Sequence, residues 1–232
     1  MQNLSSKPRG IISSVLSSAC AAWLRTQVSA VAELQVEIVA GDRQMLAGVV
    51  PSVAVAAQKI VYRGIAVQKI ELLAEQIAIN LKQVVRGKPL QLLQPIMINA
   101  NALMTSEDLH SSLTAPFFNK AITDLVKQIL ASTDQNWSIQ WQSAAIQANQ
   151  VWLQGEVQQS PDQQFPISIQ TGIELLTGQV LRLAPLLVTC DLELPGSDLQ
   201  SYEIDLGDQV NLKELTLQEG ELLCNGEIQV SP

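Results

Sequence analysis

The sequence predicts an α+β protein in which a long, strongly curved antiparallel β-sheet wraps around two main helices. Apolar residues recur with helical spacing in two stretches, 10–32 and 104–131, and this spacing places them on one face of a helix. After each stretch they alternate with polar residues, which indicates strands with one apolar and one solvated face. Residues 1–9 are predicted as a flexible tail and residues 10–232 as a single domain, because no linker rich in Pro, Gly or Ser divides the chain.

The stretch Met104–Ala131 is predicted as an amphipathic helix that kinks or breaks near Ala115. Thr105 suits the N-cap, and Asp108 three residues later approaches a capping-box pattern. Pro116 lies inside the pattern, where proline removes a helical hydrogen bond and clashes with the preceding turn. The apolar face contains Leu109, Leu113, Phe117, Ile122, Leu125 and Ile129. This face either covers a sheet as core or shares its apolar surface with a lipid.

The stretch Gly10–Ala32 has two interpretations. Its apolar face, which includes Ile12, Leu16 and Trp23, either packs on the sheet as core or lies in a membrane interface with Trp23 as the anchor. Four serines interrupt the apolar run, so it is a poor secretory signal. We therefore expect a cytoplasmic protein, or one peripheral on the cytoplasmic face of a membrane, more than an exported one.

The remaining tracts read as strands joined by short turns, as in an antiparallel meander. Turns are predicted at Arg63–Gly64 and at Glu219–Gly220, the latter within a final hairpin over Leu215–Val230. Alternation is cleanest over Phe165–Leu175. Around Pro185 the apolar positions shift phase, which indicates a β-bulge.

Composition and missing motifs exclude several classes of protein. The net charge is −8, whereas a nucleic-acid binder needs a basic surface, so no nucleic-acid partner is predicted. The lone histidine, His110, has no partner for a zinc site. Cys20, Cys190 and Cys224 are widely spaced and are predicted as small buried hydrophobic residues, with a Cys190–Cys224 disulfide left open. We predict no catalytic residues, no metal and no cofactor, hence a protein that is not an enzyme.

Four strings resemble, in their order, a bacterial family signature. They are the turn Tyr62–Gly64, the segment Arg86–Leu90 followed by a strand, the helix start Leu103–Leu113, and the C-terminal Ile204–Val230. Together they resemble the LmeA-like phospholipid-binding family, most closely its cyanobacterial branch, although His110 stands where the family usually has Asn. The resemblance covers most of the chain. It implies a TULIP-like elongated half-barrel, phospholipid binding in an apolar groove and a role in membrane or envelope upkeep.

The leading hypothesis is a binding or transfer protein that holds a phospholipid or another acyl lipid between the helix face and the sheet. One predicted wall is Leu109, Leu113, Phe117, Phe118, Ile122, Leu125 and Ile129, and the other is Ile167, Ile169, Ile173, Leu181 and Leu183. Arg86 and Lys88 are the predicted headgroup contacts, and Ile12, Leu16 and Trp23 the predicted contacts of a peripheral membrane association.

A structural or scaffolding module is the alternative. Such a module would have a filled core and no ligand cavity, and it would bind a protein partner through its edge strands or its N-terminal helix. A continuous apolar groove would favour the lipid hypothesis, and a sealed core would favour the scaffold.

Overall fold

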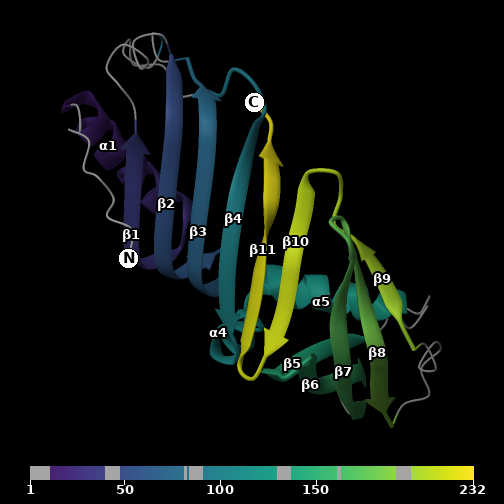
Figure 1. The fold of residues 1–232 in the computed structure, drawn as a ribbon. Helices are drawn as coiled ribbons and strands as arrows, with labels where there is room; N and C mark the ends of the chain where they lie inside the picture. Colours follow the sequence, from purple (N-terminus) through teal and green to yellow (C-terminus); the bar gives the residue numbers. More distant parts are fainter. Residues whose placement is uncertain are drawn as a thin grey trace.

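The computed structural model describes residues 11–39, 48–80, 83, 91–129, 137–160, 163–191 and 200–232. Within them it has three helices and eleven strands (Figure 1). The elements are α1 (Ile11–Gln27), β1 (Ala30–Val39), β2 (Val49–Tyr62), β3 (Ile65–Ala78), β4 (Ile96–Thr105), α4 (Ser106–Ser112), α5 (Pro116–Ile129), β5 (Ser138–Gln147), β6 (Gln150–Ser160), β7 (Gln163–Thr177), β8 (Val180–Cys190), β9 (Tyr202–Asp205), β10 (Val210–Gln218) and β11 (Glu221–Val230).

The first sheet contains six antiparallel strands in the order β1–β2–β3–β4–β11–β10. The last hairpin of the chain therefore returns to the sheet that the first four strands began. Strand β11 pairs with β4 along its whole length, from Glu221 opposite Thr105 to Val230 opposite Ile96. The predicted hairpin turn at Glu219–Gly220 is confirmed, because Gln218 and Glu221 form the last pair of β10 and β11.

The second sheet contains five antiparallel strands in the order β5–β6–β7–β8–β9. The prediction of one sheet was therefore wrong, although the antiparallel α+β class is confirmed. The physical reason is that β11 occupies the edge of β4 that β5 would need. The two sheets contact each other, for example where the Gly220 N–H donates to the Ile146 carbonyl at 3.0 Å and the Leu212 N–H to the Gly178 carbonyl at 2.7 Å.

The predicted phase shift at Pro185 is a bulge between β7 and β8. Thr171 pairs with Leu186, whereas Ile173 pairs with Leu183. Strand β8 thus has one residue more than β7 in this interval, which is the definition of a bulge. Leu183 and Leu186 are both buried, so the extra residue keeps both side chains on the apolar face.

The predicted helix over Met104–Ala131 is present as two helices. The Thr105 hydroxyl accepts the Asp108 N–H at 3.2 Å, and the Asp108 carboxylate accepts the Thr105 N–H at 2.9 Å, which completes the capping box. Helix α4 ends at Ser112 and α5 begins at Pro116, where proline costs no helical hydrogen bond. The predicted break is confirmed.

The N-terminal helix ends at Gln27, five residues before the predicted end at Ala32. Pairing with β2 takes over these residues: the Ser29 N–H donates to the Val61 carbonyl at 2.7 Å, and Ala30 lies opposite Val61. The helical spacing of apolar residues thus continues past the end of the helix into a strand. Only the pairing of these residues with β2 identifies them as a strand.

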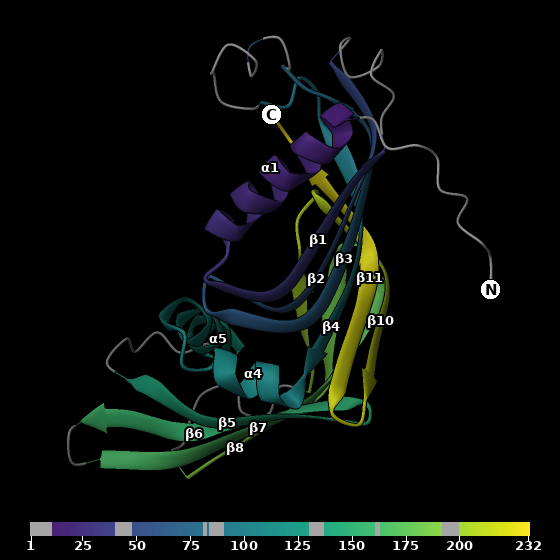
Figure 2. The same ribbon diagram turned by 90° about the vertical axis from the view of Figure 1, so that its left-hand side faces the viewer.

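All three helices lie on one side of the first sheet, and Figure 2 shows α1 and the α4–α5 pair toward opposite ends of its strands. Each end has its own core. The large core joins α4 and α5 to the second sheet and to the near end of the first; among its buried residues are Leu113, Val126, Ile146, Val157, Ile167 and Leu217. The small core contains Ile38, Val50, Ala74, Ile77 and Ile79, with Cys20 of α1 packed against it.

Candidate functional site

Between the two cores, the helix-covered face of the first sheet carries two apolar rows that cross all six strands. Each residue in a row pairs with the next across neighbouring strands. One row is Leu34, Ala57, Ile70, Ala102, Cys224 and Leu215, and the other is Val36, Val55, Leu72, Ala100, Gly226 and Leu212. We name these two rows the inner strip.

The inner strip lies between the two cores, and of its residues only Val36 packs against one of them, the small core. Apart from Ala57 and Gly226, all its residues are partly exposed, and none is a buried member of either core. The next row toward α4 (Met104, Leu222 and Leu217) belongs to the large core, and the next row toward the other end (Ile38, Val53, Ala74 and Ile98) belongs to the small core. An apolar surface therefore stays accessible between two packed regions.

The side chains of the inner strip are small in its centre and large at its sides. Strands β4 and β11 contribute the paired Ala100–Gly226 and Ala102–Cys224. The flanking strands contribute Ile70 and Leu72 from β3 and Leu212 and Leu215 from β10. Gly226 is fixed by close packing, because a Cβ there would lie 2.6 Å from the Asn211 carbonyl oxygen and 2.7 Å from the Leu212 Cα.

The inner strip carries no charge. Its one ionisable side chain is Cys224, a free thiol. Burial raises the pKa of this thiol, against a smaller lowering by a backbone hydrogen bond with Ala102. The thiol therefore stays protonated at neutral pH and behaves as a small hydrophobic group. Such a surface binds by removing apolar groups from water and not by ionic contact.

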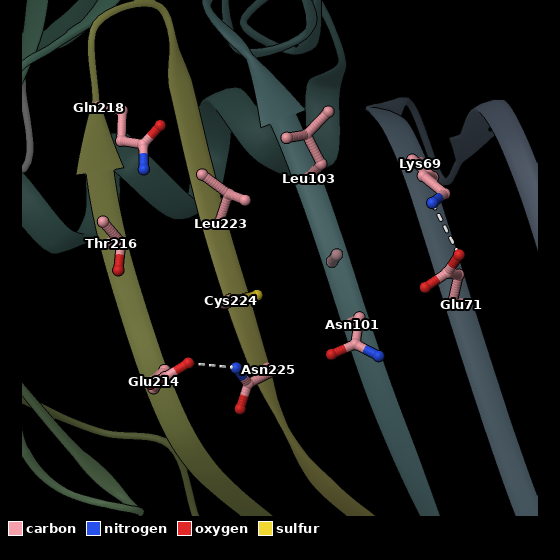
Figure 3. A pocket seen from close by; sticks show the side chains of 11 residues that line it. Lys69, Glu71, Asn101, Leu103, Glu214, Thr216, Gln218, Leu223, Cys224 and Asn225 are labelled. Carbon is pink, nitrogen blue, oxygen red and sulfur yellow. Dashed lines mark hydrogen bonds and ion pairs between the residues drawn. The ribbon is translucent and has the colours of Figure 1, made fainter. Parts of the chain in front are cut away.

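The opposite face of the first sheet is polar, since successive side chains of a strand point to opposite faces. A hollow of about 370 Å³ lies on it, formed by β3, β4, β10 and β11, and Figure 3 shows the side chains that line it. Its polar side chains contact one another: the Asn225 amide donates to Glu214 at 2.7 Å, and Lys69 pairs with Glu71 at 2.7 Å. A second hollow of about 410 Å³ beside it is lined partly by Glu37, Asn99 and Asn101. Neither hollow offers the uncharged surface that acyl chains need.

The structure packs most of the predicted lipid-contact residues against one another in the large core. Leu109, Leu113, Ile129, Ile167, Ile169 and Leu183 are buried there, and Phe118, Ile122, Leu125 and Ile173 pack around them. Phe117 is exposed and Leu181 is half-buried, and both lie outside this core. The helix face and the second sheet are thus in direct contact, and lipid contact by these residues stays a prediction.

The remaining predicted contacts separate into two groups. Arg86 and Lys88, the predicted headgroup contacts, lie outside the described residues, as do the side chains of Ile12 and Leu16. Trp23 is described and is exposed. In the described part of the chain, no helix is long and apolar enough to cross a membrane, and no group of three or more His, Cys, Asp or Glu side chains is placed to bind a metal ion.

Sequence reasoning found the strands of the inner strip but not the strip itself. The sequence shows that Leu34 and Val36 alternate with polar residues, and that Ile70 and Leu72 do so too. The pairing of β4 with β11 joins residues more than a hundred positions apart, and no local pattern encodes it. Nor does the sequence tell which apolar rows a helix covers.

The fold and this surface define an antiparallel α+β protein with an accessible, uncharged apolar strip. The model of the LmeA-like phospholipid-binding family matches residues 9–227, and the chain belongs to this family. Its description indicates lipid binding, with phospholipid as the partner, and points to a binding protein more than to an enzyme. Neither the curated proteins nor the solved structures gave a match.

Proposed function

We propose that the protein binds a phospholipid whose acyl chains lie on the inner strip. The carrying observation is the pair of apolar rows, Leu34 to Leu215 and Val36 to Leu212, left partly exposed between the two cores. Family membership supplies the class of ligand. The predicted walls on α4, α5 and the second sheet then form the packed border of the site at the large-core end.

The dimensions of the inner strip suit an acyl chain. Neighbouring strands lie about 4.8 Å apart, so a row across six strands extends for about 24 Å. One leaflet of a bilayer contributes half of a hydrocarbon core about 30 Å thick. An acyl chain therefore fits along a row with room to spare, and each methylene that leaves water contributes about 0.8 kcal/mol to binding.

The finer parts of the function are further proposals that rest on the resemblance of the sequence. We propose a TULIP-like use of the fold, transfer or storage of lipid in membrane upkeep, and a place on the cytoplasmic face of a membrane. Arg86 and Lys88, between β3 and β4 in the sequence, stay the proposed headgroup contacts, because cationic side chains pair with phosphate.

Filling the inner strip tests the proposed site. Ala102→Phe places a ring at the small-residue centre and should abolish co-purified phospholipid, measured by native mass spectrometry and lipid extraction, and uptake of a fluorescent phospholipid. Asn101→Phe is the matched control, since Asn101 is the neighbouring residue of β4 on the opposite, polar face. The control should retain wild-type lipid binding, and equal unfolding midpoints would show that both variants fold.

A scaffold without a ligand is the second candidate, because the predicted walls are packed together in the large core. It predicts that wild-type protein carries no phospholipid and takes none up. Equal lipid content in wild type, Ala102→Phe and Asn101→Phe would instead show that the lipid binds at a place other than the inner strip.

A further inference from the structure

The exposed aromatic residues of the chain gather at one end of the first sheet. The chain has nine aromatic residues, all of them described. The exposed ones are Trp23, Tyr62 and Phe117, at 60%, 46% and 58% of their full exposure. Trp137 and Trp141 by contrast are buried in the large core. Exposure of large apolar rings costs free energy in water, so three exposed rings at one end of the sheet favour a contact there.

Two contacts bring these rings to the same end. Helix α1 ends at Gln27, one turn after Trp23, and the Ser29 N–H then donates to the Val61 carbonyl beside Tyr62 at 2.7 Å. On the other side of the β2–β3 hairpin, Gly64 touches Ala115, because a Cβ on Gly64 would lie 2.3 Å from the Ala115 Cβ. Phe117 follows two residues later. Figure 2 shows the hairpin between the lower end of α1 and the α4–α5 pair.

The same end is locally basic in a chain of net charge −8. It consists of the segments 23–32, 59–66 and 109–119, which contain no Asp or Glu. Their cations are Arg25, Lys59 and Arg63. The next carboxylate along β1 is Glu33, which accepts a hydrogen bond from Gln58 at 3.1 Å. A surface with aromatic rings and cations but no carboxylate is complementary to an anionic bilayer surface.

Arg63 occupies a backbone position that its side chain does not favour. Arg63 and Gly64 form the two-residue loop of the β2–β3 hairpin, with φ of 51° and 84°. Two positive φ values are typical of a type I′ turn, in which Asn-Gly is the preferred sequence. Lys59 also has a positive φ, at 49°. Asn would fit the positive φ of both positions better than a long cation does. The Arg63 guanidinium lies 5.2 Å from the centre of the Tyr62 ring, so a cation and an exposed ring form a pair at the tip of the hairpin.

We propose that this end of the molecule docks on an anionic lipid bilayer. Trp23, Tyr62 and Phe117 enter the interface, and Arg25, Lys59 and Arg63 contact lipid phosphates. The purpose of this docking rests on the proposed function, because docking would bring the inner strip close to the membrane. Ala57 of the inner strip and Tyr62 at the tip of the hairpin are five residues apart on β2, about 17 Å along a strand.

The decisive variant is Lys59→Asn/Arg63→Asn, which removes two cations and suits the positive φ of both positions. We expect an unfolding free energy equal to or above that of wild type. Partition onto vesicles of equimolar phosphatidylcholine and phosphatidylglycerol should fall about 25-fold at low salt, since each cation near such a surface contributes about fivefold. Arg182→Asn/Lys213→Asn is the charge-matched control, because both cations lie in ion pairs elsewhere, with Glu174 and Glu227.

The aromatic part is tested by Phe117→Ser against Leu93→Ser. Leu93 is 62% exposed but lies beyond the other end of β3, which has 14 residues, about 45 Å away along the strand. Vesicle flotation should fall at least tenfold for Phe117→Ser and stay unchanged for Leu93→Ser.

Several outcomes would overturn the docking proposal. They are no flotation of wild type, equal losses of flotation in the two charge variants, or a loss of flotation in Leu93→Ser alone. Ala102→Phe separates this proposal from the proposed function: it should lose bound lipid and keep its flotation. If wild-type protein carries no lipid but still binds vesicles through this end, only the proposed lipid-holding function is contradicted.

Discussion

At the scale of single residues, two glycines with similar backbone angles face different surroundings. Gly64 has φ of 84° and abuts Ala115, whereas Gly220 has φ of 79° and open space where a Cβ would lie. Both lie in two-residue hairpin connections, since Tyr62 pairs with Ile65 and Gln218 with Glu221. A comparison of the same substitution at the two glycines therefore measures the packing of the β2–β3 hairpin against the α4–α5 connection.

Alanine at the two glycines should have unequal effects on stability. Gly220→Ala should lower the unfolding free energy by about 1–2 kcal/mol, the cost of a left-handed backbone with a Cβ. Gly64→Ala adds overpacking against Ala115, a further loss of about 1–3 kcal/mol. Urea unfolding of both variants checks this difference. Equal losses would show that the hairpin and the α4–α5 connection separate at little cost.

At the scale of elements, the start of α4 depends on side chains that the sequence makes visible. Thr105→Ala removes the hydroxyl that accepts the Asp108 N–H and should cost about 1 kcal/mol of unfolding free energy. Thr114→Ala is the control: its hydroxyl donates to the Ser111 carbonyl at an exposed site, so we expect a change within about 0.5 kcal/mol. Urea unfolding measures both, and an unaffected Thr105→Ala variant would contradict the capping role.

Local features of the sequence predicted those elements whose determinants are local. The capping box at Thr105, the break at Pro116 and the bulge at Pro185 each follow from one or two residues and their immediate spacing. The end of α1 was misplaced because the residues after Gln27 suit a helix or a strand, and pairing with Val61 decides between them.

At the scale of the whole molecule, the number of sheets and the location of the candidate site depend on long-range pairing. Pairing of β11 with β4 occupies the edge of β4 that β5 would need and aligns Ala100 and Ala102 with Gly226 and Cys224. The alternation in each strand was readable, but which rows a helix buries was not. This is why the predicted walls lie in the large core, while the accessible apolar surface lies between the cores.

The three cysteines allow the two lipid locations to be compared in one molecule. All three are free and partly buried: Cys224 lies in the inner strip, Cys190 packs against the large core and Cys20 packs against the small core. Phospholipid loading should slow maleimide labelling of Cys224 at least tenfold relative to the lipid-free protein, because the acyl chain covers its thiol. Labelling of Cys190 should not change.

Peptide mapping by mass spectrometry follows all three sites without any substitution. Burial raises the pKa of both the Cys20 and Cys224 thiols, so the labelling reaction is best run at mildly alkaline pH. Slower labelling of Cys190 with an unchanged Cys224 would instead place the lipid between α5 and the second sheet, where the helix face would have to separate from Ile167 and Ile169 to admit it.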